Sequence, residues 1–206
     1  MTSREPARTS ARRTRPAILT ILVVVCGAIV AALVHQPPAS FASLVDVLRG
    51  GHHGGLGEAD GAVPDGVTVF DDDIPSVANL DPDLLGALRE AAADAADDGV
   101  EFFVNSGWRS AEYQEQLLRE AVSQYGSKEE AARWVSTPET SRHVLGDAVD
   151  IGPTDATAWL SRHGAKYGLC QIYGNESWHY ELRPQAVDDG CPPMYADPTQ
   201  DPRARK

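Results

Sequence analysis

Apolar residues recur at helical spacing in four stretches of the chain, and residues typical of helix ends bound them. The first stretch begins at Asp81-Pro82, where Pro stands at the first helical position, and Gly99 ends it. Ser110 is a typical N-cap for the second stretch, and Gly126 ends it. This pattern predicts helices over residues 82–98, 111–125, 127–135 and 154–167.

Three shorter stretches are typical of strands. VEFFV at 100–104 is apolar enough for a short buried strand, and two more strands are predicted near 169–173 and 178–182. Gly146 allows a sharp turn, after which Ala148 and Asp150 alternate onto one strand face. Helices come first and strands cluster late, without regular βαβ alternation. We therefore predict an α+β fold in which helices pack on a small antiparallel sheet.

The longest apolar run, AILTILVVVCGAIVAALV, fills residues 17–34 and contains no charge and no Pro. As a helix it would span about 27 Å, close to the hydrocarbon thickness of a bilayer. Five Arg and one Glu stand before it in residues 1–16, so the positive-inside rule places the rest of the chain outside the membrane. We expect a retained transmembrane anchor. The alternative is a signal segment whose cleavage near Ser40-Phe41-Ala42 releases a secreted protein.

A Gly-rich stretch, GGHHGGLGEADG, lies between this run and the first predicted helix. It has little periodicity and several helix breakers, so residues 35–75 are predicted to be a flexible linker. The folded domain is then expected over residues 76–186. Residues 187–206 are rich in Pro and Asp and are predicted to be a tail.

The charge of the chain is unevenly divided. The whole chain carries −12 and its first 16 residues carry +4, so the remainder carries −16. A domain this acidic repels phosphate backbones, which argues against nucleic acid as a partner. Nothing in the sequence specifies an oligomeric state.

Three Cys residues agree with an extracellular location. Cys26 lies in the apolar run, and Cys170 and Cys191 are the only two beyond it. An oxidising compartment would let these two pair, whereas free thiols or metal ligation are the alternatives. Since no third Cys and no CxxC spacing accompany them, we expect a disulfide between Cys170 and Cys191.

Two histidines and an aspartate have the side chains that a catalytic zinc ion needs, namely three protein ligands that leave one position open. A turn at Gly146 would let His143 fold back toward Asp150. His179 enters the last predicted strand, and an antiparallel sheet would place that strand beside the one bearing Asp150. The HxxxxxxD spacing alone is weak evidence for a metal, and the ExWH sequence that begins at Glu176 strengthens it.

Three motifs, in this order, resemble the M15 family of D-Ala-D-Ala metallopeptidases of the VanY and VanX type. They are Ser106-Gly-Trp-Arg109-Ser110 with Gln114 behind it, SxHxxGxAxD, and ExWH. The resemblance covers about residues 78–183. It implies the compact α+β fold that this family shares with Hedgehog-type domains, and zinc-dependent cleavage of peptidoglycan stem peptides.

The resemblance also implies a role for each matching residue. Its metal ligands for Zn²⁺ would be His143, Asp150 and His179. Glu176 would be the catalytic base, since a glutamate that does not bind the metal can take a proton from water and deliver it to the leaving amine. Arg109 would stabilise the oxyanion, and Ser141 and Gln114 would bind substrate.

These roles predict a membrane-anchored D-alanyl-D-alanine carboxypeptidase that removes the terminal D-Ala of peptidoglycan stem peptides. Only Gly174-Asn175 links Tyr173 to Glu176, which is shorter than in many carboxypeptidases of the family and leaves the bond that is cleaved open. A peptidoglycan endopeptidase and a D,D-dipeptidase are therefore alternatives. A non-catalytic module that holds zinc is a third, but such a module needs neither Glu176 nor Arg109.

Overall fold

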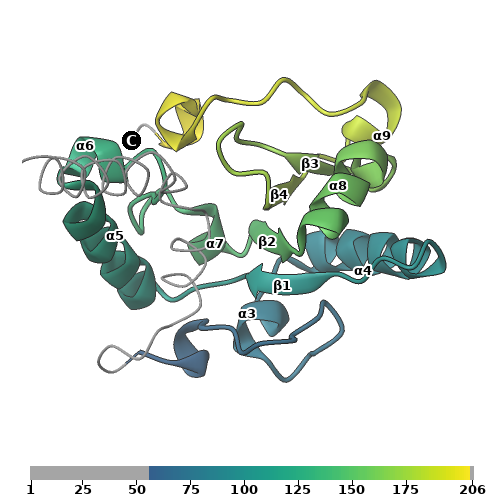
Figure 1. Ribbon diagram of the computed structural model, residues 1–206, viewed down its shortest axis with the longest axis horizontal. Helices are drawn as coiled ribbons and strands as arrows, with labels where there is room; N and C mark the ends of the chain where they lie inside the picture. The colour runs from purple at the N-terminus through teal and green to yellow at the C-terminus, as the bar shows by residue number, and fades with distance from the viewer. Residues whose placement is uncertain (1–55, 205–206) are drawn as a thin grey trace, which may run out of the picture. The chain divides into compact units, whose positions relative to one another are not determined.

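The computed structural model describes residues 56–204 (Figure 1). The predicted basic segment, the transmembrane or signal segment and residues 35–55 of the predicted linker lie outside the described residues. None of the helices between residues 56 and 204 has the length and apolar content that a membrane crossing requires.

Two long helices and several short ones pack around a four-stranded sheet. The α-helices are α3 (Pro75–Ala78), α4 (Pro82–Asp97), α5 (Ala111–Tyr125), α6 (Lys128–Ala131), α7 (Arg142–Leu145), α8 (Thr154–His163) and α9 (Ala186–Asp189). The 3-10 helices are η1 (Glu58–Asp60), η2 (Gly164–Tyr167), η3 (Pro198–Gln200) and η4 (Pro202–Ala204). The strands are β1 (Phe103–Ser106), β2 (Ala148–Gly152), β3 (Leu169–Gln171) and β4 (His179–Leu182).

The caps that the sequence indicates set the bounds of the two long helices. The Asp81 carboxylate accepts hydrogen bonds from two backbone N–H groups at the start of α4, and the Ser110 hydroxyl does the same once for α5. Gly126 ends α5 with a φ of 81°, in the left-handed region. The predictions for α4 and α5 are thus confirmed. The other two predicted helices are shorter: α6 stops at Ala131, and α8 gives way to η2.

The strand order in the sheet is β1-β2-β4-β3, and every neighbouring pair is antiparallel. The predicted α+β class with a small antiparallel sheet is therefore confirmed. β1 begins three residues later than predicted, at Phe103. In the register of β2 with β4, Asp150 lies opposite His179, and in the register of β1 with β2, Ser106 lies opposite Asp150.

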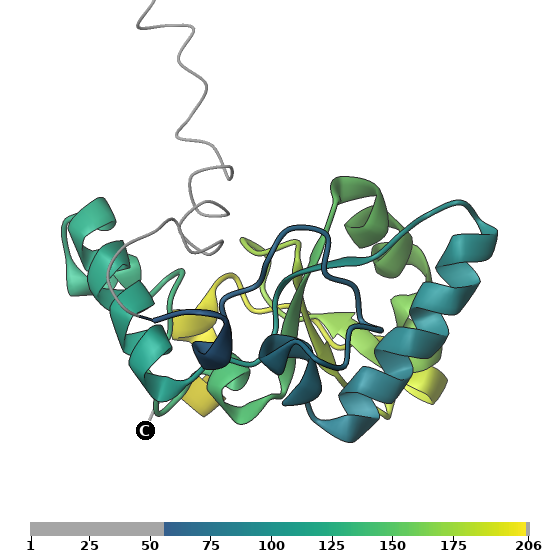
Figure 2. The same ribbon diagram turned by 90° about the horizontal axis from the view of Figure 1, so that it is seen from below.

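Two of the three hydrophobic clusters in the described residues form around the long helices α4 and α5. The larger one joins α4 and α8 to the strands, and its fully buried members include Leu84, Leu88, Val149 and Ile151. The smaller one lies between α5 and α6 around Leu117. In both views α5 lies at one end of the sheet and α4 at the other, with α7 and β2 between them (Figures 1 and 2).

The prediction of a linker over 35–75 is wrong for residues 56–75. Val63, Val67 and Val69 are buried in the larger hydrophobic cluster, and the Val67 carbonyl accepts a hydrogen bond from the backbone N–H of Val104. Val67 and Val69 alternate as in a strand, but Gly and Asp stand on both sides of them, so the pattern is too short to predict an element. The folded domain therefore begins before residue 76.

The prediction of a tail over 187–206 is wrong as far as residue 204. Tyr195 forms a parallel bridge with Tyr173, and the side chains of Asp197 and Asp201 are buried. Buried carboxylates require partners. Thr199 and Arg203 supply some of them within the segment, and Arg133 and Tyr173 supply the others from elsewhere in the domain, which the composition of the segment does not indicate.

The predicted disulfide is confirmed. Cys170 on β3 and Cys191 form a disulfide with an S–S distance of 2.01 Å. Cys170 is fully buried beside Ile172, Tyr173 and Ala186, so the bond fastens the chain after α9 to the edge of the sheet.

Replacing both Cys170 and Cys191 by Ser is expected to lower the free energy of unfolding by about 3 kcal/mol. The disulfide closes a loop with a sequence separation of 21 residues, and a loop of that size restricts the unfolded chain by about this amount. Urea unfolding of the wild type and the double variant, both without reductant, measures the difference. Equal stabilities would show that the bond does not form in the folded protein.

Candidate metal centre

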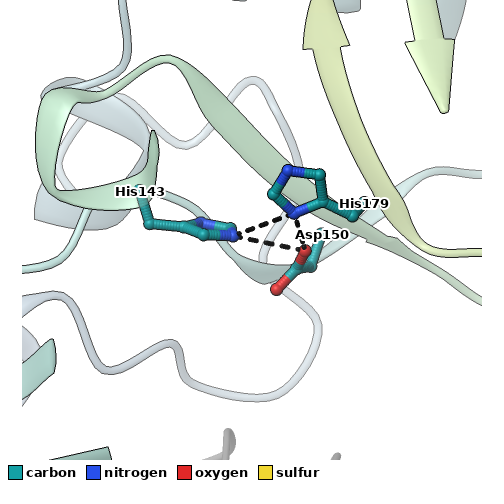
Figure 3. A group of neighbouring side chains, drawn as sticks. All are labelled: His143, Asp150 and His179. Atoms are coloured by element: carbon teal, nitrogen blue, oxygen red, sulfur yellow. Dashed lines mark hydrogen bonds and ion pairs between the residues drawn. The ribbon is translucent and has the colours of Figure 1, made fainter. Parts of the chain in front are cut away.

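Three buried side chains from separate elements bring one ligand atom each to a common position (Figure 3). His143 lies on α7, Asp150 on β2 and His179 on β4. Asp150 Oδ1 lies 3.4 Å from His143 Nε2 and 3.3 Å from His179 Nδ1. The two imidazole nitrogens are 3.3 Å apart.

A capped helical turn aims His143 at Asp150. The Ser141 hydroxyl accepts a hydrogen bond from the Val144 N–H and starts α7, and Gly146 ends it with a φ of 77°. A Cβ at Gly146 would lie 2.6 Å from the Asn79 carbonyl oxygen, so both the backbone conformation and the space require Gly. The predicted sharp turn is thus confirmed. The helix α7 before it is too short to give a periodic pattern.

Hydrogen bonds outside the group fix the tautomer of each histidine. His143 Nδ1 lies 2.8 Å from the Gly107 carbonyl oxygen, which only accepts, so Nδ1 carries the proton and Nε2 is left to bind a metal. His179 Nε2 lies 3.4 Å from a carboxylate oxygen of Glu181, so Nε2 carries a proton and Nδ1 is the nitrogen that can bind a metal in place of a proton. Both free nitrogens point into the group.

The residues fit a zinc ion. Ligand atoms bound tetrahedrally at about 2.0–2.1 Å from zinc lie roughly 3.3–3.4 Å from one another, and the three observed separations agree with this. Asp150 Oδ1 is buried and accepts no hydrogen bond within the described residues. The two nitrogens nearest to it are the ones that the outer hydrogen bonds leave for a metal. Three potential ligand atoms that face one another need a metal ion, or a proton in its place, between them, so the geometry supports the predicted cofactor.

Arg109 holds the second oxygen of Asp150. Its Nη2 donates to Asp150 Oδ2 at 3.0 Å, and both side chains are almost completely buried. Burial raises the pKa of the Asp150 carboxyl, but His143, His179 and Arg109 outweigh it and hold the pKa well below its usual range. Asp150 therefore stays ionised, as a metal ligand must.

Arg109 is itself fixed by two further contacts. Its Nε donates to Ser106 Oγ at 2.7 Å, and its Nη1 donates to Gln114 Oε1 at 3.0 Å. The Gln114 amide in turn donates to the Ser136 carbonyl oxygen at 2.8 Å. These bonds explain the Ser-Gly-Trp-Arg-Ser motif and its distant Gln. That Arg109 stabilises an oxyanion and that Gln114 binds substrate stay predictions.

Glu176 lies beside the ligand atoms without joining them. Its Oε2 is 3.7 Å from His179 Nδ1, and its Oε1 is buried with no hydrogen-bond partner within residues 56–204. In the metal-free protein, burial raises the pKa of the Glu176 carboxyl to about 8. A carboxylate that is buried, without a donor and next to a metal position is suited to take a proton from a bound water.

A pocket opens above the group. Glu176, Arg109, Ser141, Arg142, Trp134 and Trp178 line it together with the three metal ligands. Ser141 thus lies where the resemblance places it, at the pocket wall. Its hydroxyl also caps α7, so its role toward substrate stays a prediction.

Sequence analysis missed one residue of the site, Glu181. Positions two apart on a strand share a face, so the alternation of His179 with Glu181 on β4 is the signal that would have found it. Burial lowers the pKa of the His179 imidazole, but hydrogen bonds to Asp150 and Glu181 outweigh it and raise the pKa to about 10 in the metal-free protein. Metal and proton therefore compete for His179 Nδ1.

The α+β fold with a buried His–Asp–His group and an adjacent free glutamate defines a metallopeptidase type of site. The family model for VanY, D-alanyl-D-alanine carboxypeptidase, matches residues 77–185. The chain belongs to this family, which confirms the resemblance seen in its three motifs.

Known relatives agree with the assignment. The chain is 30% identical over 139 residues to a D-alanyl-D-alanine carboxypeptidase of Enterococcus faecalis, in a match that covers 54% of this chain and 52% of the relative. The chain thus spans about half the length of this curated relative. A solved structure of VanYB in complex with D-Alanine-D-Alanine is 28% identical, covers 54% of this chain and 74% of that one, and has a TM-score of 0.50. An LD-carboxypeptidase, LdcB, shares the fold at 24% identity and a TM-score of 0.50, over 65% of this chain and 73% of that one.

Proposed function

We propose that the protein is a zinc-dependent D-alanyl-D-alanine carboxypeptidase that removes the terminal D-Ala of peptidoglycan stem peptides. The observation that carries the proposal is the convergence of His143, Asp150 and His179 beside Glu176, which lines the same pocket and whose Oε1 has no hydrogen-bond partner among the described residues. A structural zinc site needs no such carboxylate. Family membership and the bound D-Alanine-D-Alanine of VanYB support the choice of substrate.

Each residue of the site has a defined task in this reaction. Zinc supplies Lewis acidity, which lowers the pKa of water and polarises a carbonyl. Glu176 accepts one proton from the attacking water and then donates that proton to the nitrogen of the leaving D-Ala as the peptide bond breaks. Arg109 provides a fixed positive charge that favours the developing oxyanion, and its bond to Asp150 keeps this ligand in place. Ser141 lies at the pocket wall to contact the peptide.

We further propose that the enzyme acts outside the cell, anchored by residues 17–34. The Cys170–Cys191 disulfide supports an oxidising compartment. The apolar run and the arginines before it support a single-pass membrane anchor with the catalytic domain outside. Wall-linked peptides are within reach of an anchored domain there.

Incubation with a muramyl pentapeptide is expected to release one alanine, in a reaction that a chelator abolishes and zinc restores. Mass spectrometry of the products measures the loss, and a pentapeptide ending in L-Ala is the control for stereochemistry. Release of a dipeptide, or cleavage of cross-linked dimers only, would replace the proposal by a D,D-dipeptidase or an endopeptidase. No zinc-dependent product from any of these substrates would favour a non-catalytic module.

A further inference from the structure

Glu181 is a buried carboxylate surrounded by three cationic or donor side chains. Its side chain is 1% exposed, and its Oε1 lies 3.4 Å from His179 Nε2. Arg203 donates to both carboxylate oxygens, from Nη1 at 2.7 Å and from Nη2 at 3.2 Å, and Arg183 donates to Oε2 at 2.6 Å. A buried carboxylate with this many donors has a fixed position and orientation.

Arg203 comes from a segment that the family model does not cover. The match ends at residue 185, and Arg203 lies on η4, near the end of the chain. We call residues 191–204 the C-terminal segment. The guanidinium of Arg203 is held in turn by Asp201, to which its Nε donates at 3.0 Å. Asp201 also accepts a hydrogen bond from the Tyr173 hydroxyl at 3.0 Å.

The rest of the C-terminal segment is fastened to the loop that carries Glu176. The backbone N–H groups of Gly174 and Asn175 donate to the carbonyls of Tyr195 and Ala196 at 2.8 and 3.2 Å. Further contacts are the disulfide at Cys191 and the ion pair of Asp197 with Arg133 at 3.2 Å. Pro198 reaches the wall of the catalytic pocket. The C-terminal segment therefore packs against the residues that form the metal centre and contributes to the wall of its pocket.

We propose that Glu181 and Arg203 are positioning residues of the metal centre, through which the C-terminal segment fixes the tautomer and orientation of His179. The inference rests on the proposed function only in taking zinc as the metal. Arg203 and Arg183 compensate the buried charge of Glu181, so that the carboxylate is stable in place without a proton. Glu181 then accepts the Nε2–H of His179 and leaves Nδ1 with a lone pair toward the ion.

Replacing Glu181 by Gln reverses the hydrogen bond at His179. The single amide oxygen would remain with the arginines, because they only donate, and the amide NH₂ would then face His179 Nε2. That arrangement favours the proton on Nδ1, the atom that must bind the metal. Zinc affinity is therefore expected to fall about 10- to 100-fold, the usual range for the partner of a metal-binding histidine.

A comparison of Arg203→Met with Arg133→Met distinguishes the loss of the contact with Glu181 from a weaker attachment of the C-terminal segment to the domain. Both arginines bind the C-terminal segment or belong to it, but only Arg203 touches Glu181. We expect zinc affinity to fall about 10-fold in Arg203→Met and to change less than about twofold in Arg133→Met. Arg203→Lys keeps one charge and loses the two-nitrogen contact, so an intermediate loss is expected.

Chelator competition on the full-length protein gives the zinc affinity of each variant, and the absorption spectrum of the cobalt-substituted protein reports the ligand geometry. A merely structural role would leave both unchanged in variants that fold. Wild-type affinity and spectrum in Glu181→Gln and Arg203→Met would overturn the proposal, as would equal losses in Arg203→Met and Arg133→Met. If Arg203→Met does not fold, Arg203→Lys and Glu181→Gln decide in its place. A wild type that binds zinc but cleaves no pentapeptide would contradict the proposed function and leave these binding measurements valid.

Discussion

Replacing Glu176 by Gln is expected to lower kcat by about 10²- to 10⁴-fold and to leave zinc affinity unchanged. The amide has nearly the same shape but cannot accept a proton from water, and the carboxylate is not among the three converging ligands. Steady-state kinetics on the pentapeptide and chelator competition for zinc give the two quantities. A loss of activity with full zinc binding is the result that assigns the proton transfer to Glu176.

Glu139→Gln is the matched control, since Glu139 is an exposed glutamate on the loop before α7 and is not among the residues that line the pocket at the metal centre. Its kcat is expected to stay within about twofold of the wild type. Near-normal hydrolysis by Glu176→Gln would remove Glu176 from the mechanism and leave the metal assignment intact.

The metal-free protein gives a second measurement of the same residue. Burial raises the pKa of Glu176 from 4.5 to about 8, so the folded state favours the protonated form. The stabilisation from that proton is complete below pH 4.5 and is lost as the pH rises toward and through 8. Gln does not titrate. In chelator, Glu176→Gln is therefore expected to lose less stability than the wild type between pH 5 and pH 8, as measured by urea unfolding.

The order and type of most elements could be predicted because local signals agree with the final structure. Asp81, Ser110 and Gly126 mark the ends of α4 and α5 by hydrogen bonds and by a left-handed backbone conformation that the sequence itself specifies. Gly146 does the same for the turn before β2. The metal ligands were found because two motifs place them on a turn and on a strand, and the register of β2 with β4 then brings Asp150 opposite His179.

Contacts between distant segments explain what the sequence could not reveal. Val63 and Val69 lie in a Gly- and Asp-rich stretch, and they are buried because they pack against residues of α4 and the sheet, which are distant in the sequence. Arg203 stands among Pro and Asp, and its partner Glu181 is on β4, so no local pattern joins them. Residues of this kind become part of the core or of the site through tertiary structure alone.

Asp150→Asn is expected to lower zinc affinity more than 100-fold and to destabilise the metal-free protein by about 3 kcal/mol. Asp150 has two tasks that both need its charge: Oδ1 faces the two histidines, and Oδ2 accepts from Arg109 at 3.0 Å. The affinity loss should exceed the 10- to 100-fold cost of changing an outer partner of a ligand, because a ligand itself is changed. The stability loss arises because the buried guanidinium is left without a compensating charge.

Asp147→Asn separates these effects from a general effect of losing a carboxylate near β2. Asp147 is 42% exposed and pairs with Arg142 at 3.1 Å, outside the metal group, so a stability change below about 1 kcal/mol and unchanged zinc binding are expected. Chelator competition and urea unfolding apply to both variants. If Asp150→Asn bound zinc as the wild type does but remained destabilised, Asp150 would serve only to hold Arg109, and the metal would have to rest on the two histidines. If it lost zinc without losing stability, Arg109 would have to find its charge partner elsewhere, and Glu176 is the other buried carboxylate that faces the same pocket.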